Sequence, residues 1–150
     1  VGQIPLYYNK KAPQSHDYVE MSASPLYPFG YGLSYTSFDY SDLHLSALMP
    51  RSFEISFKVR NTGKYDGEEV AQLYLRDEYA SVVQPLKQLK HFARFYLKRG
   101  EEREVKFILS EEDFSLVDRN LKKIVEPGTF QIMIGAASND IRLQTKVAIK

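Results

Sequence analysis

Apolar and polar residues alternate along most of the chain beyond residue 38. The clearest stretch is 53–60, FEISFKVR, in which every second residue is apolar. A period of two puts alternate side chains on opposite faces of a β-strand, so that one face is buried and the other is wet. Turn-forming residues separate seven such stretches, and we predict strands at 39–47, 53–60, 68–77, 89–97, 104–109, 130–134 and 141–149.

The predicted strand at 68–77 differs from the others because it is apolar on both faces. Such a pattern indicates a central strand, or a strand whose outer face is covered. Just before the sixth predicted strand, Pro127 and Gly128 have the composition of a type II turn, in which the glycine takes a positive φ.

One short helical turn is predicted between the fifth and sixth strands. Ser110 has the chemistry of a helix N-cap, and three acidic residues follow it in what would be the first turn. We predict that a helical turn begins here and runs to about Val117, with Phe114 and Val117 facing inward.

No long helical pattern separates the strands, so a parallel sheet with crossover helices is not expected. Seven short alternating strands within about 110 residues are typical of an immunoglobulin-like sandwich. The chain has no cysteine and no tryptophan, which favours a fibronectin type III-like version over an antibody domain. The predicted fold class is therefore an all-β, seven-stranded sandwich of the immunoglobulin or fibronectin type III-like kind, with an extended N-terminal arm.

The N-terminal arm is less regular than the rest of the chain. A short apolar run at 1–8 contains Pro5, which a central strand would not tolerate, so an edge strand or an extended tail is predicted. Residues 9–25 show little periodicity and are expected to form a linker or a long loop.

Residues 27–36, YPFGYGLSYT, are expected to connect the arm to the sandwich. Two glycines in it, Gly30 and Gly32, permit tight bends and a close approach to neighbouring backbone. The aromatic rings around them present large flat surfaces that are stabilised when another surface buries them. This stretch is therefore predicted to be a stiff connector anchored by its aromatic side chains.

Composition and charge exclude several classes of function. The chain has 150 residues and a net charge of +1, with 20 basic and 19 acidic residues, whereas an electrostatic nucleic-acid binder would carry a basic stripe. No apolar run approaches the roughly 20 residues that cross a membrane. The lack of cysteine excludes disulfides and thiolate metal sites. We therefore expect neither nucleic acid nor membrane among the partners.

Residues 25–38, PLYPFGYGLSYTSF, resemble the junction in family 3 glycoside hydrolases of the β-glucosidase type. Residues 2–9, GQIPLYYN, are similar to the last strand of that family's α/β sandwich domain. The chain departs from the family at Gln84, where arginine is common, and at 122–124, KKI, where a tryptophan is common. The resemblance continues in order through 59–63 (VRNTG), 67–74 (GEEVAQLY), 85–90 (PLKQLK) and 125–130 (VEPGTF).

The resemblance implies a longer parent chain with an N-terminal barrel, an α/β sandwich and then a fibronectin type III-like domain. Residues 1–36 would be the end of the α/β domain plus the connector, and 37–150 would be the fibronectin type III-like domain. The parent would be a retaining glycoside hydrolase, with an Asp nucleophile and a separate acid/base in the earlier domains. Neither motif occurs in this sequence, so no catalytic residue is carried over. The resemblance also favours a periplasmic or secreted parent.

The partners implied by the resemblance are the upstream domains of the same chain. We expect Tyr27, Phe29, Tyr31 and Tyr35 to make this interdomain contact. Without that neighbour, residues 1–36 would be mobile, fold back on the sandwich, or pair in a dimer through the N-terminal arm. Two other functions stay open, namely a carbohydrate-binding module that stacks sugars on tyrosines, and an adhesive surface sandwich.

The remaining candidates for chemistry are acidic clusters and scattered histidines. The catalytic pair of a retaining glycosidase needs two carboxyl groups about 5–5.5 Å apart across a cleft. The acidic clusters of this sequence instead lie at predicted turns and strand ends. None has the spacing of a calcium loop, and the histidines form no i, i+4 pair for zinc. We therefore predict no catalytic, cofactor-binding or metal-binding residue. The groups considered are Asp66, Glu68, Glu69, Asp77, Glu78, Glu111, Glu112, Asp113, His16, His44 and His91.

Overall fold

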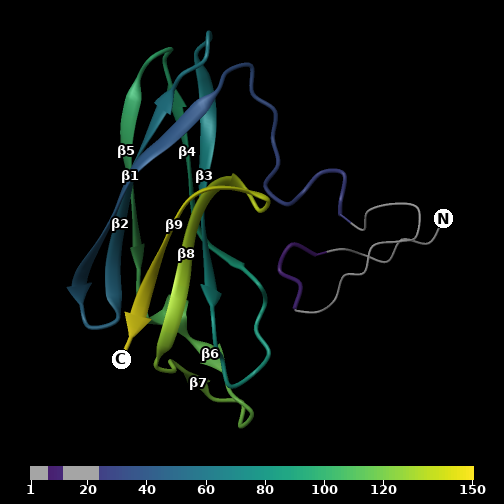
Figure 1. Cartoon of the computed structure of the whole chain (residues 1–150), viewed down its shortest axis with the longest axis vertical. Coiled ribbons are helices and arrows are strands. Elements are labelled where there is room, and N and C mark those ends of the chain that lie inside the picture. The colour runs from purple at the N-terminus through teal and green to yellow at the C-terminus, as the bar shows by residue number, and fades with distance from the viewer. Residues whose placement is uncertain (1–6, 12–23) are drawn as a thin grey trace, which may run out of the picture.

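Two antiparallel β-sheets lie face to face in the computed structural model, which describes residues 7–11 and 24–150 (Figure 1). One sheet has three strands, in the order β1 (Phe38–Met49), β2 (Ser52–Asn61) and β5 (Glu102–Leu109). The other sheet has four strands, in the order β4 (Gln88–Leu97), β3 (Gly67–Asp77), β8 (Gly128–Ala137) and β9 (Asp140–Ile149).

Each of the seven predicted strands lies within one of these strands, and the predicted all-β sandwich is confirmed. The two facing sheets have three and four strands, and two further short strands that were not predicted, β6 (Leu116–Val117) and β7 (Lys123–Ile124), pair with each other in a separate sheet. Two residues are too few to show a period of two, so the sequence pattern held no signal for them.

The hydrophobic core lies between the two sheets and is built from the inward faces of the alternating strands. On β2, Ile55, Phe57 and Val59 are buried, whereas the Lys58 side chain between them reaches solvent. Burying an apolar side chain of this size contributes about 1.5–3 kcal/mol, so these inward positions determine which face of each strand is inside. The four-stranded sheet contributes, among others, Ala71, Leu73, Leu75, Phe95, Leu97, Ile132 and Ile134.

The predicted helical turn is present but shorter than expected. A 3₁₀ helix, η1 (Glu111–Phe114), follows Ser110, whose backbone N–H donates to Asp113 Oδ2 at 2.8 Å. Phe114 is buried as predicted, but Val117 is 54% exposed, because the chain has by then become the extended strand β6. Within the described residues, no helix has the length and hydropathy to cross a membrane.

The predicted type II turn at Pro127 and Gly128 is wrong. Gly128 is the first residue of β8 and pairs with Ile149 of β9, and it does not have a positive φ. In the described part of the chain the glycines with positive φ are Gly30 and Gly100. Pairing with β9 holds Gly128 in extended backbone, which a type II turn excludes at its third position.

The prediction that 68–77 is a central strand is confirmed, since β3 lies between β4 and β8. Its Leu73 points into the core. Gln72 and Tyr74 point to the opposite, outer face of the sheet, yet they are only 3% and 0% exposed. A layer outside the sheet must therefore cover them, and N-terminal segments supply it.

The expected strand or tail at 1–8 and the expected linker at 9–25 fall mostly on residues 1–6 and 12–23, outside the described residues. His16 lies there as well. The described parts of the arm are residues 7–11 and 24–36.

Candidate interdomain contact surface

The connector, defined here as residues 24–36, runs beside the four-stranded sheet before it enters β1 (Figure 1). The backbone N–H of Ser138, in the β8–β9 turn, donates to the carbonyl oxygen of Phe29 at 2.9 Å. The Gln72 side-chain amide donates to the carbonyl oxygen of the next residue, Gly30, at 3.3 Å. Two consecutive peptide units of the connector are thus attached to the outer face of the sheet.

Gln72 occupies the centre of this attachment. Its Oε1 accepts a hydrogen bond from the Tyr74 hydroxyl, and its Nε2 donates to the carbonyl of Ala136 as well as to Gly30. A buried amide without partners would be costly, and here both of its polar atoms are engaged. Gln72 is the polar residue within the otherwise apolar run 70–75 of β3, and the connector that it holds explains its presence there.

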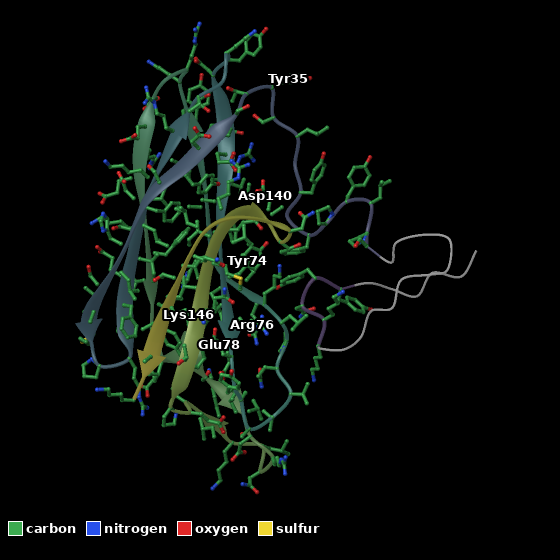
Figure 2. The ribbon with its side chains drawn as sticks, viewed as in Figure 1. Tyr35, Tyr74, Arg76, Glu78, Asp140 and Lys146 are labelled. Carbon is green, nitrogen blue, oxygen red and sulfur yellow. The ribbon has the colours of Figure 1, made fainter. Side chains whose placement is uncertain are left out.

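A stack of two aromatic rings covers Tyr74, beside Gln72 on the outer face of the sheet. The rings of Tyr8 and Phe29 are stacked, with centroids 4.1 Å apart and an interplanar angle of 16°. Tyr8 also meets the edge of Tyr74 at 6.1 Å, and burial raises the pKa of Tyr74 to about 12. Figure 2 labels Tyr74 on the sheet. Two segments of the arm, separated in sequence, thus share one contact on the outer face.

The segment 7–11 is held by further backbone contacts. Leu86 N–H donates to the carbonyl oxygen of Lys10 at 2.9 Å, and Lys11 forms an isolated β-bridge with Pro85. The Tyr8 hydroxyl accepts a hydrogen bond from the Leu89 N–H at 3.3 Å. This part of the arm therefore lies along the loop that leads into β4.

The end of the connector is attached to a buried asparagine. Thr36 Oγ1 donates to Oδ1 of Asn61 at 2.6 Å, and Asn61 is fully buried. The Asn61 Nδ2 donates to the carbonyl oxygens of Tyr65 and Leu97 at 2.8 and 3.1 Å. One side chain therefore links the connector, the β2–β3 turn and the end of β4.

The predicted glycines behave differently. Gly30 has a φ of +80°, and a Cβ there would lie 2.2 Å from Oε1 of the buried Gln72. Gly32 has an ordinary φ, and a Cβ there would have no neighbour within 4 Å. The predicted close approach is therefore confirmed at Gly30 and wrong at Gly32.

The four predicted contact residues do not share one environment. Phe29 stacks on Tyr8 over the sheet and is 45% exposed. Tyr35, labelled in Figure 2, is 95% exposed. The rings of Tyr27 and Tyr31 lie 5.5 Å apart and are tilted by 40°, so they form no flat platform. We define the outer connector surface as the large apolar side chains that the connector presents to solvent: Leu26, Tyr27, Tyr31, Leu33 and Tyr35.

Leu26 and Leu33 were missed by the sequence analysis, which searched for aromatic residues. Both are more than four-fifths exposed, at 86% and 89%. Large contiguous apolar surfaces on a soluble domain mark interaction sites, whereas isolated exposed residues do not. Leu26 and Leu33 lie within ten residues of one another in the same connector. This local concentration of large apolar residues is a sequence signal from which both could have been predicted.

A charged cavity of about 510 Å³ separates part of the connector from the sandwich. Three of the carboxylates that line it have partners: Glu68 pairs with Arg94, and Asp140 pairs with Arg142 at 2.8 Å. Glu69 accepts a hydrogen bond from the Tyr40 hydroxyl at 3.2 Å. Burial raises the pKa of both Glu69 and Tyr40.

The Arg142 guanidinium lies 5.3 Å from the Tyr40 ring centroid and donates to the backbone carbonyl of Phe38. The bond from Arg142 is the largest cause that lowers the pKa of Asp140. Arg142 therefore links β9 to the start of β1, whereas Arg94 and Glu68 pair with each other across β4 and β3.

The other acidic clusters are engaged in ion pairs or caps at the surface. Glu111 pairs with Arg51 at 2.7 Å, and Asp66 accepts hydrogen bonds from the Tyr96 hydroxyl and the Arg99 N–H, which lower its pKa. No group of three or more potential metal ligands occurs in residues 7–11 and 24–150.

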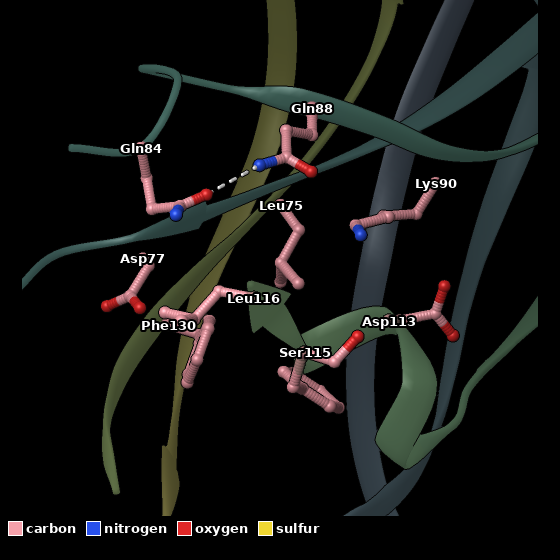
Figure 3. A pocket seen from close by; sticks show the side chains of 10 residues that line it. Leu75, Asp77, Gln84, Gln88, Lys90, Asp113, Ser115, Leu116 and Phe130 are labelled. Atoms are coloured by element: carbon pink, nitrogen blue, oxygen red, sulfur yellow. Dashed lines mark hydrogen bonds between the residues drawn. The ribbon is translucent and has the colours of Figure 1, made fainter. Parts of the chain in front are cut away.

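The pocket in Figure 3 encloses about 20 Å³, enough for about one water molecule and too small for a sugar. Asp77 and Asp113 lie at opposite ends of it (Figure 3). Lys90, on the same side of the pocket as Asp113, has a pKa lowered by burial. This pocket therefore has the dimensions of a packing gap.

Antiparallel sheets of three and four strands that enclose one core define an immunoglobulin-like β-sandwich. Within it, the sequence profile of the fibronectin type III-like domain matches residues 69–138, from β3 through β8.

Relatives extend this match over nearly the whole chain. A β-xylosidase of Formosa agariphila is 43% identical over 97% of this chain, but over 21% of the enzyme. A periplasmic β-glucosidase of Salmonella typhimurium is 41% identical over 95% of this chain and 20% of the enzyme. A solved β-glucosidase of Erythrobacter marinus superposes with a TM-score of 0.91 at 39% identity, covering 99% of this chain and 20% of that one.

The chain thus spans about a fifth of the length of the relatives that it matches. It belongs with the C-terminal, fibronectin type III-like domains of the family 3 glycoside hydrolases.

Proposed function

We propose that this chain is the accessory domain of a longer β-glucosidase-like hydrolase, and that it braces the domains that precede it. In this proposal residues 37–150 are the accessory domain, and residues 1–36 are the end of an α/β domain plus the connector. The partners are the upstream domains of the same polypeptide, and the parent cleaves glycosidic bonds with retention. The relative named as periplasmic supports an extracytoplasmic location for the parent.

The observation that carries the proposal is the two-sided connector. Its inner side is attached to the sheet through Gly30 and Phe29, and its outer side exposes Tyr27, Tyr31 and Tyr35. A segment held firmly by one domain while it exposes large apolar side chains is suited to bury them against a second domain. A freely moving linker would need neither property.

The accessory domain is catalytically silent on its own. The acidic clusters of the described residues serve in caps, ion pairs and turns, and Glu69 accepts a hydrogen bond from Tyr40. The sequence has neither the nucleophile motif nor the acid/base motif of the family. Hydrolysis therefore belongs to the upstream domains, and this domain acts on it by holding them in place.

Two experiments test the proposal. The reading frame upstream of Val1 is extended, and the longer protein and the 150-residue chain are both assayed with nitrophenyl β-glucosides. We expect hydrolysis by the longer protein alone. Hydrolysis by the 150-residue chain that is lost on mutating one of its carboxylates would contradict the proposal, as would an upstream sequence without a hydrolase domain.

The second experiment substitutes Tyr35 by Ala in both proteins. In the 150-residue chain the unfolding free energy should change by less than about 0.5 kcal/mol, because Tyr35 is almost fully exposed. In the longer protein we expect a loss above about 1 kcal/mol, as for a buried interface aromatic. Equal, negligible effects in both proteins would remove Tyr35 from the interdomain contact.

A further inference from the structure

The outer faces of both sheets carry ion pairs, on the four-stranded sheet between Arg94 and Glu68 and between Lys146 and Glu78, but the two faces differ at their centres. On the three-stranded sheet, ion pairs cover the outer face: Lys106 with Glu54 at 3.2 Å, and Lys58 with Asp42 at 3.0 Å. Ile108 is a large exposed apolar residue on that face, opposite Glu54 on the neighbouring strand. Leu48 and Met49, at the end of β1, are exposed as well. Such a charge-laced face is stable in water and needs no partner.

The outer face of the four-stranded sheet is apolar at its centre. Phe92 of β4 is paired with Gln72, so both side chains are on the outer face, and Phe92 is 67% exposed. Met133 is paired with Tyr74 and is buried beneath the same layer. Phe92 is therefore the exposed continuation of the patch that the connector begins to cover.

Both described parts of the arm reach the sandwich on this side. Tyr8 and Phe29 stack over Tyr74, and the backbone at Lys10 and Lys11 pairs with the loop that enters β4. Along that loop, Val83 is a further exposed apolar side chain, at 66%. The first described segment, residues 7–11, therefore lies on the side of the four-stranded sheet.

Resting on the proposed function, we infer that the upstream domain packs against the outer face of the four-stranded sheet, with Phe92 as a buried contact. The connector is then the first layer of this interface, and the outer connector surface and Phe92 belong to one continuous patch. The relatives, of which this chain spans a fifth, supply the length of polypeptide that such an occupant requires. The three-stranded sheet faces water.

Hydroxyl-radical footprinting tests this assignment on side chains, without any substitution. Phe92 and Ile108 are a matched pair, because both are exposed apolar residues on edge strands, one on each outer face. In the longer protein we expect Phe92 to be oxidised at least about fivefold more slowly than in the 150-residue chain, since interface cores exclude water. Ile108 should be oxidised at the same rate in both.

The substitutions Phe92→Glu and Ile108→Glu provide a second readout. Both isolated variants should fold, because both side chains are exposed. In the longer protein, Phe92→Glu should speed proteolytic cleavage between the domains by about tenfold, and Ile108→Glu should leave it unchanged.

Each alternative outcome overturns a separate statement. Protection of Ile108, or equal oxidation of Phe92 in both proteins, would place the upstream domain elsewhere and leave the proposed function standing. An upstream sequence without a hydrolase domain would overturn the proposed function itself. Protection of Phe92 in the 150-residue chain that increases with protein concentration would assign the face to a second copy, and the inference would fail.

Discussion

The side-chain amide of Gln72, in the middle of β3, donates to the carbonyl oxygen of Gly30, 42 residues earlier in the chain. The contact is close enough that a Cβ on Gly30 would collide with Gln72. This pair explains two features that look unrelated in the sequence, a polar residue within the otherwise apolar run 70–75 of β3 and a glycine between two aromatic residues. It also makes the connector part of the sandwich.

Gly30→Ala should destabilise the chain by about 1–3 kcal/mol, because alanine resists the positive φ and its methyl group would displace the hydrogen-bonded Gln72. Gly32→Ala is the matched control, two residues away in open space and with an ordinary φ. It should change stability by less than about 0.5 kcal/mol. Urea unfolding of both variants measures the difference, and similar losses would contradict the assigned role of Gly30.

Asn61→Leu should cost about 2–4 kcal/mol. The substitution keeps the branched shape and the number of side-chain heavy atoms, but it leaves the carbonyls of Tyr65 and Leu97 without the donor that they share. Thr36→Val removes one of the bonds to Asn61 and should cost about 1 kcal/mol. Thermal unfolding measures the loss. If Asn61→Leu unfolds at the same temperature as the unsubstituted chain, the β2–β3 turn does not depend on this side chain.

Phe29→Ala should release the connector from the sheet, since it removes the ring that stacks on Tyr8. Aromatic pairs of this kind contribute about 0.5–1.5 kcal/mol beyond their buried area. The readout is amide exchange at Ser138, whose N–H donates to the Phe29 carbonyl and should exchange faster in the variant. Tyr35→Ala, at an exposed position of the same connector, should leave that rate unchanged. Faster exchange in both variants would point to a general loosening.

Glu69→Gln should stabilise the chain near pH 7 and have little effect at about pH 4. Burial raises the pKa of Glu69 above the ordinary carboxyl value of 4.5, so the folded state binds the proton more tightly than the unfolded state. Stability is therefore lost as the pH rises from the unfolded pKa through the folded one, and a neutral amide escapes that loss.

Unfolding in urea at several pH values checks this expectation, with Glu68→Gln as a more exposed neighbour on the same strand. The stabilisation by Glu69→Gln should shrink steadily as the pH falls. A difference that is independent of pH would mean that hydrogen bonding to Tyr40, and not burial of charge, dominates at this position.

The strands and the core followed from local pattern. A period of two is a property of the strand backbone, so the stretch 53–60 indicated both the strand and its buried face without reference to any partner. The same reasoning found β3 as a central strand from its two apolar faces. It could not find β6 and β7, which exist because short segments around η1 meet in space.

In the connector, local sequence pattern was not enough to predict the environment of each residue. Its aromatic residues predicted a contact, but the sequence could not say that Phe29 turns inward while Tyr35 turns outward, or that Gly30 is constrained and Gly32 is free. These differences depend on Gln72 and Tyr74, more than forty residues away in the sequence. The type II turn at Gly128 failed for the same reason, since pairing with β9 overrode the local preference.

By itself, then, the sequence determined the all-β class, the inward face of each long strand and the absence of the family's catalytic motifs, because these are written in residue identity and short-range periodicity. Only the tertiary structure decided which sheet receives the N-terminal arm and which side chains of the connector remain exposed. Those outcomes depend on contacts between distant segments, whose energies come from burial and hydrogen bonds that no local window contains.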